Sequence, residues 1–172
     1  MNLKQHLKSL SKDQLIKEIQ TLSTKFLQVK QYYELRIKEN TSNEILAVYK
    51  KRIKEEFFPT HGFGDGRLSV ARKPIQEYKK IATDQLEIID LMLYYVEIGV
   101  KYTRAYGDIN EQFYNSMENM YENALGLIQQ TNMHNDFYNR CKKIVTDTEG
   151  IGWGFYDNLS ALFKTYFKKF ES

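Results

Sequence analysis

The sequence predicts an all-α protein, and three observations lead to that class. Apolar residues recur at helical spacing through most of the chain, so that they fall on one face of each segment. No segment alternates apolar and polar residues for long enough to predict a strand. The two prolines and nine glycines are mostly clustered, so long helices should be interrupted at only a few points. We expect one domain over residues 1–172, an irregular multi-helix bundle or short α-hairpin array of about six to eight helices.

The first elements follow from caps and breakers. Ser11 followed by Gln14 matches a capping box, in which each side chain bonds the other residue's backbone N–H. Apolar residues then continue at helical spacing through Val29, which predicts one helix up to that point. A second helix should begin near residue 43. Its inner face ends at Phe57, before Pro59 and three nearby glycines stop it.

The middle of the chain contains three further predicted helices. Ser69 is the expected N-cap of the first of them. Thr83 or Asp84 should open the most apolar helix, which is expected to end near Gly107. Asn110 should begin the next one, because asparagine is a favoured N-cap residue.

The last two predicted helices are separated by a glycine-rich loop. One helix should span about residues 135–148, and the loop at residues 150–154 follows it. Asp157 is expected in the first turn of the final helix, where a negative charge favours the helix N-terminus. We expect that helix to end near Phe170.

Composition and charge restrict the class of protein. The net charge is +3, which is weak for a dedicated nucleic-acid-binding protein. Cys141 is the only cysteine, so an intramolecular disulfide and a multi-cysteine zinc site are excluded. The N-terminus lacks the apolar core of a secretion signal. The most apolar run, residues 86–100, is too short and too charged to span a bilayer. We therefore expect a cytoplasmic protein with no membrane partner.

Several stretches of the chain together resemble a known family. They read RLSVARKPI at residues 67–75, DLMLYYVEIGV at 90–100, YGDI at 106–109 leading into FYNSME at 113–118, and IGWGF at 151–155. With these motifs, the chain resembles an uncharacterised bacterial family of small helical proteins that is classed as a domain of unknown function. The resemblance covers nearly the whole chain. It implies an all-helical fold and a cytoplasmic bacterial protein, and it supplies no activity, substrate or catalytic residue.

Common catalytic and metal-binding patterns are missing from the sequence. The histidines His6, His61 and His134 lie in separate segments, and none belongs to a Glu-x-x-His or His-Glu-x-x-His pair. There is no phosphate-binding P-loop motif. Cys141 stands between Arg140 and Lys142, which could lower its pKa, but a small packed side chain is the simpler interpretation. We expect no catalytic residue, no metal ligand and no cofactor.

One candidate binding region is the glycine-rich loop at residues 59–67 with the helix start that follows it. Glycines and a helix N-terminus can bring backbone N–H groups close to an anion. Arg67, Arg72 and Lys73 could then contact phosphates, and His61 and Tyr78 could stack on bases. The alternative is a solvated connector with no ligand.

A second candidate is a polar stripe on the most apolar helix. Asp90, Tyr94, Glu97, Lys101 and Arg104 are spaced four, three, four and three residues apart, so they share one face. The stripe could line a groove with an enzymatic site, or it could be the only solvated face of a central helix. An i,i+4 ion pair of Glu97 with Lys101 would stabilise the helix by about 0.2–0.5 kcal/mol.

The only tryptophan, Trp153, lies between two glycines and is the third candidate. Such an aromatic side chain can anchor a partner, because glycine lets the partner approach closely. It can equally fill the gap between the last two helices. The sequence leaves both interpretations open.

These observations rank three functions. The leading hypothesis is a non-enzymatic interaction module that binds another protein through a tyrosine-rich helical surface. The first alternative is a nucleic-acid-binding protein that uses the basic residues around 67–80. The second alternative is an enzyme with a polar site on the helix at residues 84–106. The sequence does not predict an oligomeric state.

Overall fold

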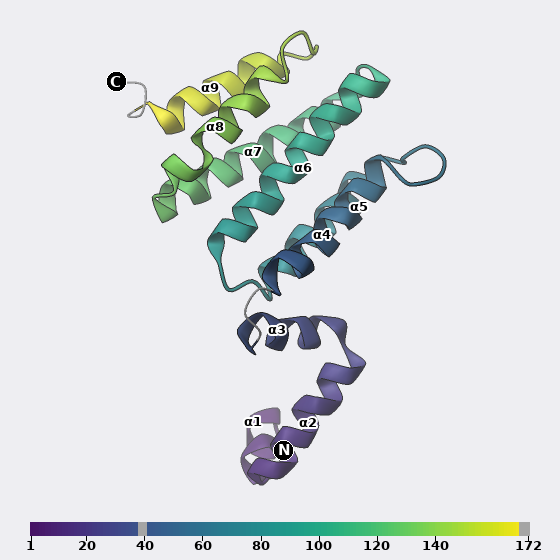
Figure 1. Cartoon of the computed structure of the whole chain (residues 1–172), viewed down its shortest axis with the longest axis vertical. Helices are drawn as coiled ribbons and strands as arrows, with labels where there is room; N and C mark the ends of the chain where they lie inside the picture. Colours follow the sequence, from purple (N-terminus) through teal and green to yellow (C-terminus); the bar gives the residue numbers. More distant parts are fainter. Residues whose placement is uncertain (38–40, 169–172) are drawn as a thin grey trace. The chain divides into compact units, whose positions relative to one another are not determined.

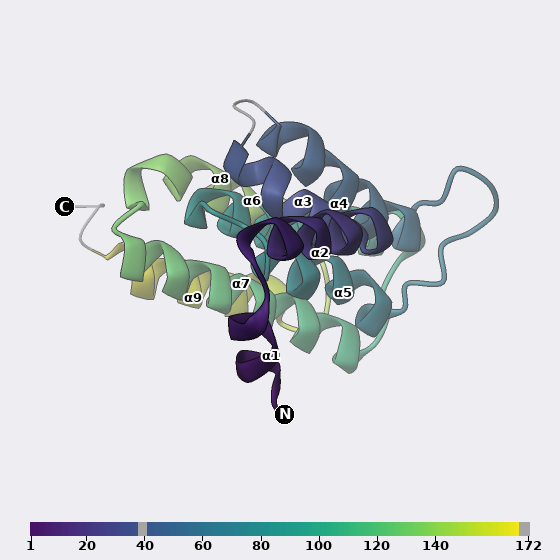
Figure 2. The same ribbon diagram turned by 90° about the horizontal axis from the view of Figure 1, so that it is seen from below.

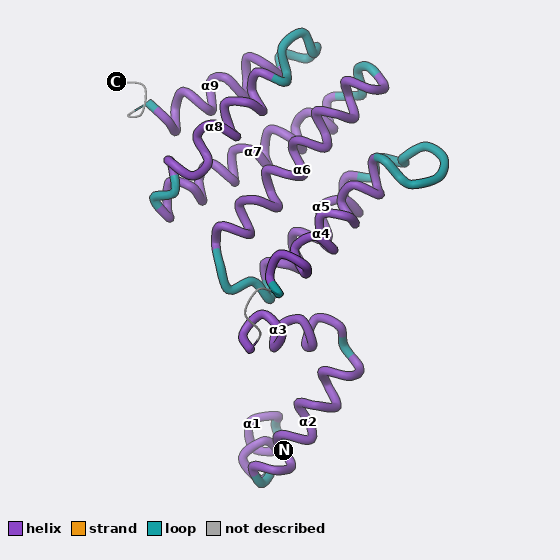
Figure 3. The backbone as a smooth tube through the Cα atoms, viewed as in Figure 1, coloured by secondary structure: helices purple, strands orange, loops and turns teal. Residues whose placement is uncertain are grey.

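The computed structural model of the chain describes residues 1–37 and 41–168. These residues form nine α-helices and no strand, which confirms the all-α class (Figure 3). The count exceeds the predicted six to eight helices. The chain divides into two compact units, Met1–Ile45 and Leu46–Ser172, which are described separately below. The prediction of a single domain concerns how the two units fold together, and it stays a prediction.

The first unit contains three helices and the start of a fourth. They are α1 (Leu3–Ser9), α2 (Lys12–Lys25), α3 (Leu27–Ile37) and the first residues of α4 (Ser42–Phe57). The capping box that Ser11 predicts is present at the start of α2. A second capping box, which the sequence analysis did not identify, opens α1 and explains one of the additional helices.

The break between α2 and α3 corrects the prediction of one continuous helix to Val29. At Phe26 the backbone is extended, with φ −124° and ψ 112°. No proline or glycine marks the break. The preceding turns contain hydroxyl side chains that bond the helix's own carbonyl oxygens, such as Thr24 to Gln20 at 2.9 Å. Such bonds compete with the regular hydrogen bonds of the helix and favour bends. They are a local cause of the end of α2 before Phe26.

The second unit is built from the rest of α4 and five further helices (Figure 1). The five are α5 (Leu68–Lys79), α6 (Gln85–Tyr106), α7 (Glu111–Thr131), α8 (His134–Thr146) and α9 (Phe155–Phe167). The long α6 contacts α5, α7 and α8, and α9 packs on α7 and α8. The apolar α6 is therefore the centre of this unit, as its composition predicts.

Two of the three predicted caps in this unit are confirmed. The side chains of Asp84 and Asn110 accept the N–H groups of the first turns of α6 and α7. The prediction for Ser69 is wrong, because α5 begins at Leu68 and Arg67 occupies the N-cap position without a side-chain cap bond. Asp157 lies in the first turn of α9, as expected. The expected end of that helix at residue 170 lies outside the described residues.

The core of the second unit is aromatic. Phe57 at the end of α4 is fully buried, and its ring lies 5.9 Å from that of Tyr95 and 6.4 Å from that of Phe113. Buried tyrosine hydroxyls find partners inside: that of Tyr95 lies 2.9 Å from Ser116 Oγ. Buried polar groups need such partners because an unpaired one loses its hydrogen bonds to water. Five tyrosines belong to this core, at positions 49, 78, 95, 114 and 121.

The contact between α6 and α7 is close because α6 contains a glycine at the crossing. A Cβ atom added at Gly99 would lie 2.2 Å from Met117 Sδ. Because Gly99 has no side chain, Met117 can pack directly against the backbone of α6. The sequence motif that contains Gly99 is part of the family resemblance, and here it has a packing role.

Candidate functional site

The N-terminal unit exposes an apolar face. On α2, apolar residues spaced four, three and four apart share one stripe. We call it the α2 seam, and it consists of Leu15, Ile19 and Leu22 of α2 together with Phe26, the residue at the C-cap of this helix. Ile19, Leu22 and Phe26 are 39%, 43% and 55% exposed. A helix with such a stripe normally packs it against a core. An exposed seam of this kind is therefore a candidate binding surface.

The exposure extends beyond the seam. Other large apolar side chains of the same unit are also exposed, namely Met1, Leu3, Leu7, Ile16, Leu27, Tyr32 and Ile37. Within the described part of this unit, the only buried residues are Gln31 and Ile45. A segment this short seldom forms a sufficient core of its own. The unit therefore presents apolar surface instead of enclosing it.

Two shallow grooves follow this apolar face. One holds about 480 Å³ and is lined along α2 by Lys17, Glu18, Thr21, Leu22, Lys25 and Phe26. The other holds about 530 Å³ between α1 and the start of α2, where Leu3, Leu7 and Leu15 are among its lining residues. Both combine apolar floors with lysine side chains, which is the composition of a surface that another helix could occupy.

The loop between α4 and α5 is held by Arg67. The loop extends clear of the helices (Figure 2). At its end the Arg67 guanidinium binds both carboxylate oxygens of Glu56, at 2.9 and 3.2 Å, and the Arg67 N–H donates to the same carboxylate at 2.9 Å. Asp65 lies 3.3 Å from the guanidinium. Burial alone would raise the pKa of Glu56, but these bonds with Arg67 outweigh it and leave the pKa below its ordinary value.

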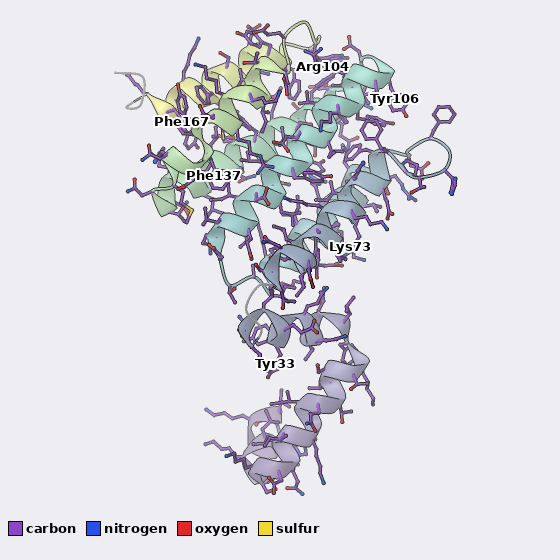
Figure 4. All side chains as sticks on the ribbon, viewed as in Figure 1. Tyr33, Lys73, Arg104, Tyr106, Phe137 and Phe167 are labelled. Atoms are coloured by element: carbon purple, nitrogen blue, oxygen red, sulfur yellow. The ribbon has the colours of Figure 1, made fainter. Side chains whose placement is uncertain are left out.

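The structure only partly assembles the predicted phosphate-binding residues. Arg67 and Arg72 both line a pocket of about 390 Å³ at the start of α5. Lys73 is exposed on α5 outside that lining (Figure 4). His61 is exposed in the loop. The stacking role proposed for Tyr78 is wrong, because this ring is fully buried and its hydroxyl donates to Glu87 at 2.7 Å.

Two carboxylates of the polar stripe of α6 bind an arginine from another helix, which was not predicted from the sequence. Arg140, from α8, donates to both oxygens of Glu97 at 2.6 and 3.0 Å and also binds the Asp90 carboxylate. Lys50 of α4 lies 2.5 Å from the other Asp90 oxygen. Burial lowers the pKa of Arg140, and the two carboxylates outweigh that effect and raise it. The expected Glu97–Lys101 pair is therefore replaced by one between helices.

A groove of about 590 Å³ runs beside this cluster between α6 and α8. Glu97, Lys101 and Arg104 line it, and Asp90 does not. Arg104 donates to the carbonyl oxygens of Asp147 at 2.6 Å and of Glu149 at 3.1 Å, at the end of α8. Since unpaired carbonyls accumulate at a helix C-terminus, Arg104 acts there as a cap.

Tyr94 and Trp153, two further aromatic residues of the predicted sites, both make packing contacts. Tyr94 of the stripe is half-buried, with Lys50 Nζ 5.5 Å from its ring centre. Trp153 has a positive φ of 62° and is 55% exposed. One face of its indole stacks on Tyr114 with ring centres 6.1 Å apart. Trp153 thus combines features of both interpretations left open by the sequence.

The single cysteine lies in the core. Cys141 on α8 is fully buried, and burial raises its pKa to about 12. The neighbouring arginine, which the sequence suggested could activate the thiol, does not offset this effect. The thiol is therefore protonated at neutral pH and is a poor nucleophile.

Two further properties of the described residues concern metal and membrane binding. Over residues 1–37 and 41–168, no group of three or more histidine, cysteine, aspartate or glutamate side chains is arranged to hold a metal ion. In the same ranges, no helix combines the length and apolar character needed to cross a membrane.

These features define an all-helical protein with a well-packed C-terminal unit and an N-terminal unit that exposes apolar helix surface. The chain belongs to a family of unknown function, DUF6155, whose family model matches residues 1–168. No curated protein and no solved structure matches the chain.

Proposed function

We propose that the chain is a protein-binding module that docks through the apolar face of α1, α2 and α3. The exposed α2 seam is the observation that carries this proposal. Full burial of an isoleucine, leucine or phenylalanine side chain contributes about 1.5–3 kcal/mol. The seam residues are already partly covered, so each can contribute about half of that on docking. Together with the apolar residues of α1 and α3, this suffices for a specific complex.

The tyrosine-rich surface of the original hypothesis is replaced by an aliphatic one. Only two of the eleven tyrosines of the second unit, Tyr106 and Tyr156, are exposed, whereas leucine and isoleucine dominate the exposed face of the first unit. The polar stripe of α6 supports an enzymatic role less well, because Glu97 and Asp90 are already engaged by Arg140. As a location we propose the bacterial cytoplasm, on the basis of the single cysteine, because a lone cysteine is typical of a reducing compartment.

Site-specific photo-crosslinking tests the proposal. A photoreactive amino acid at Leu22 should form crosslinks to another polypeptide in the cells that express the protein. The same amino acid at the exposed Lys164 of α9 is the control, and it should form few. Crosslinks from Leu22 that join only residues of the same chain would reject the proposal.

A second candidate function is the binding of nucleic-acid phosphates at Arg67 and Arg72. It is favoured by one observation, namely that Arg67 and Arg72 line the same pocket beside the start of α5. Fluorescence anisotropy with single-stranded RNA at two salt concentrations tests it. Binding that weakens steeply with salt and is lost in Arg72→Ala would support this function. No binding at low salt would remove it.

A further inference from the structure

We infer that the partner of the α2 seam is the α2 seam of a second copy of this chain, with the two helices antiparallel. This inference rests on the proposed function and names its partner. The seam residues Leu15, Ile19, Leu22 and Phe26 follow the alternating three- and four-residue spacing of a two-helix coiled coil. The choice of a second copy rests on the charges beside the seam.

Glu18 and Lys25 lie on the same flank of the seam, seven residues apart. Both side chains are exposed and line the α2 groove together with Leu22 and Phe26. Among the described residues, Glu18 forms one ion pair, with the partly exposed His6 at 3.7 Å. In an antiparallel pair of helices this flank faces the same flank of the other copy. Glu18 of each copy then meets Lys25 of the other, which gives two opposite-charge pairs related by the twofold axis.

The other arrangement of two copies offers no such pairs. In a parallel coiled coil the flank of Glu18 and Lys25 faces the opposite flank of the partner helix. That flank carries Ile16 and Ser23, so Glu18 gains no positive partner. The sequence of α2 is therefore self-complementary in one orientation only.

The apolar layers also match in the antiparallel orientation. Ile19 of one copy packs against Leu22 of the other at the two central layers. Leu15 packs against Phe26 at the two outer layers, so that a partly covered leucine meets the most exposed side chain of the seam. Only four layers form, and a short seam gives a weak dimer. We expect a dissociation constant on the order of 10 µM.

Sedimentation equilibrium of the full chain tests the inference. The average mass should rise from that of the 20.4 kDa monomer toward twice that value between about 1 and 300 µM. Ile19→Glu places a charge in both central layers and should keep the chain monomeric over the whole range. Glutamate is a good helix former, so this exposed substitution leaves α2 intact.

Charge reversal tests the orientation. Glu18→Lys turns both pairs into repulsive ones and should weaken the dimer about 5- to 30-fold. Adding Lys25→Glu restores opposite charges between the copies and should restore the affinity. It does not restore the contact with His6, so recovery in the double variant reports the contact between copies. Glu55→Lys, an exposed charge reversal on α4, is the matched control and should change nothing.

Three results would overturn the inference. They are a monomer at every concentration, a dimer that is insensitive to Ile19→Glu, and a dimer that the double charge reversal does not recover. The proposed function is judged separately. Crosslinks from Leu22 to a different protein would uphold the proposed function and reject the second copy as the partner.

Discussion

The two units of this protein share one sequence pattern, apolar residues at helical spacing, but differ in how far those residues are buried. In the second unit, apolar residues at helical spacing enter a core in which large side chains such as Phe57 and Tyr121 are fully buried. In the first unit, the same spacing on α2 leaves Ile19 and Leu22 about two-fifths exposed. Helical periodicity thus predicts that a face will be covered, and it does not predict what covers it.

The difference has a physical cause in length and in ring content. The second unit is long enough to enclose a core, and its aromatic rings pack edge to face at several helix contacts. The first unit has fewer residues and only two tyrosines, Tyr32 and Tyr33, which contact each other. Short chains bury a small share of their surface. The comparison therefore predicts large effects of substitution in one unit and small effects in the other.

The largest effect is expected at Phe57. Replacing this buried ring by alanine should lower the free energy of unfolding by about 3–5 kcal/mol, because it leaves a cavity among several aromatic rings. Urea denaturation followed by circular dichroism measures it. Phe63→Ala is the control, since that ring is 85% exposed and its loss should change stability by less than about 0.5 kcal/mol.

A smaller loss is expected at Arg140. Replacing it by methionine leaves Asp90 and Glu97 close to each other with one lysine, Lys50, to balance them. Arg140 is 27% exposed, so water relieves part of the cost, and we expect a loss of about 1–3 kcal/mol. The exposed Lys143→Met, which also removes an ion pair, should cost less than about 0.5 kcal/mol. Equal losses in the two variants would remove the structural role given to Arg140.

Glu56 should give the stability a specific pH dependence. Its pKa is lowered in the folded state, so the unfolded state binds more protons in acid, and the stabilisation is lost as the pH falls. The stabilisation is fully present above the ordinary value of 4.5 and disappears as the pH falls through the lower folded value. Glu56→Gln should cost about 1 kcal/mol at pH 7. The gap between wild type and variant, from denaturation at several pH values, should narrow in acid; a gap independent of pH would contradict the assignment.

The smallest effect on stability is expected in the α2 seam. Leu22→Gln removes an apolar side chain that already contacts solvent. In dilute solution the free energy of unfolding should therefore fall by less than about 0.5 kcal/mol. Thermal denaturation at low protein concentration checks this value. A loss above about 2 kcal/mol would mean that Leu22 is a core residue of the folded chain.

Most of the secondary structure could be predicted from the sequence. The caps at Ser11, Asp84 and Asn110 were predictable because each depends on neighbouring residues alone. The break at Phe26 was not, since no proline or glycine encodes it. The additional helix α1 was missed although the pattern of its cap, Asn2 with Gln5, is visible in the sequence.

The candidate sites were less predictable because they depend on contacts across the fold. The stripe of α6 was identified correctly as one polar face, but Arg140 is 43 residues from Glu97 and nothing local links them. Tyr78 was proposed to stack on bases because it lies close to the basic residues in sequence, but its ring is buried and its hydroxyl donates to Glu87. The apolar spacing of the α2 seam was visible in the sequence and predicted a helix, but it could not show whether the seam is covered.

Amide hydrogen exchange at two protein concentrations tests the central claim most directly. At low concentration the amides of α2 should exchange much faster than those of α6, because few contacts protect the first unit. Raising the concentration should slow exchange in α2 and leave α6 unchanged, since docking of a second copy covers only the seam. Protection of α2 that equals that of α6 at every concentration would contradict the account, because the seam would then be covered within one chain.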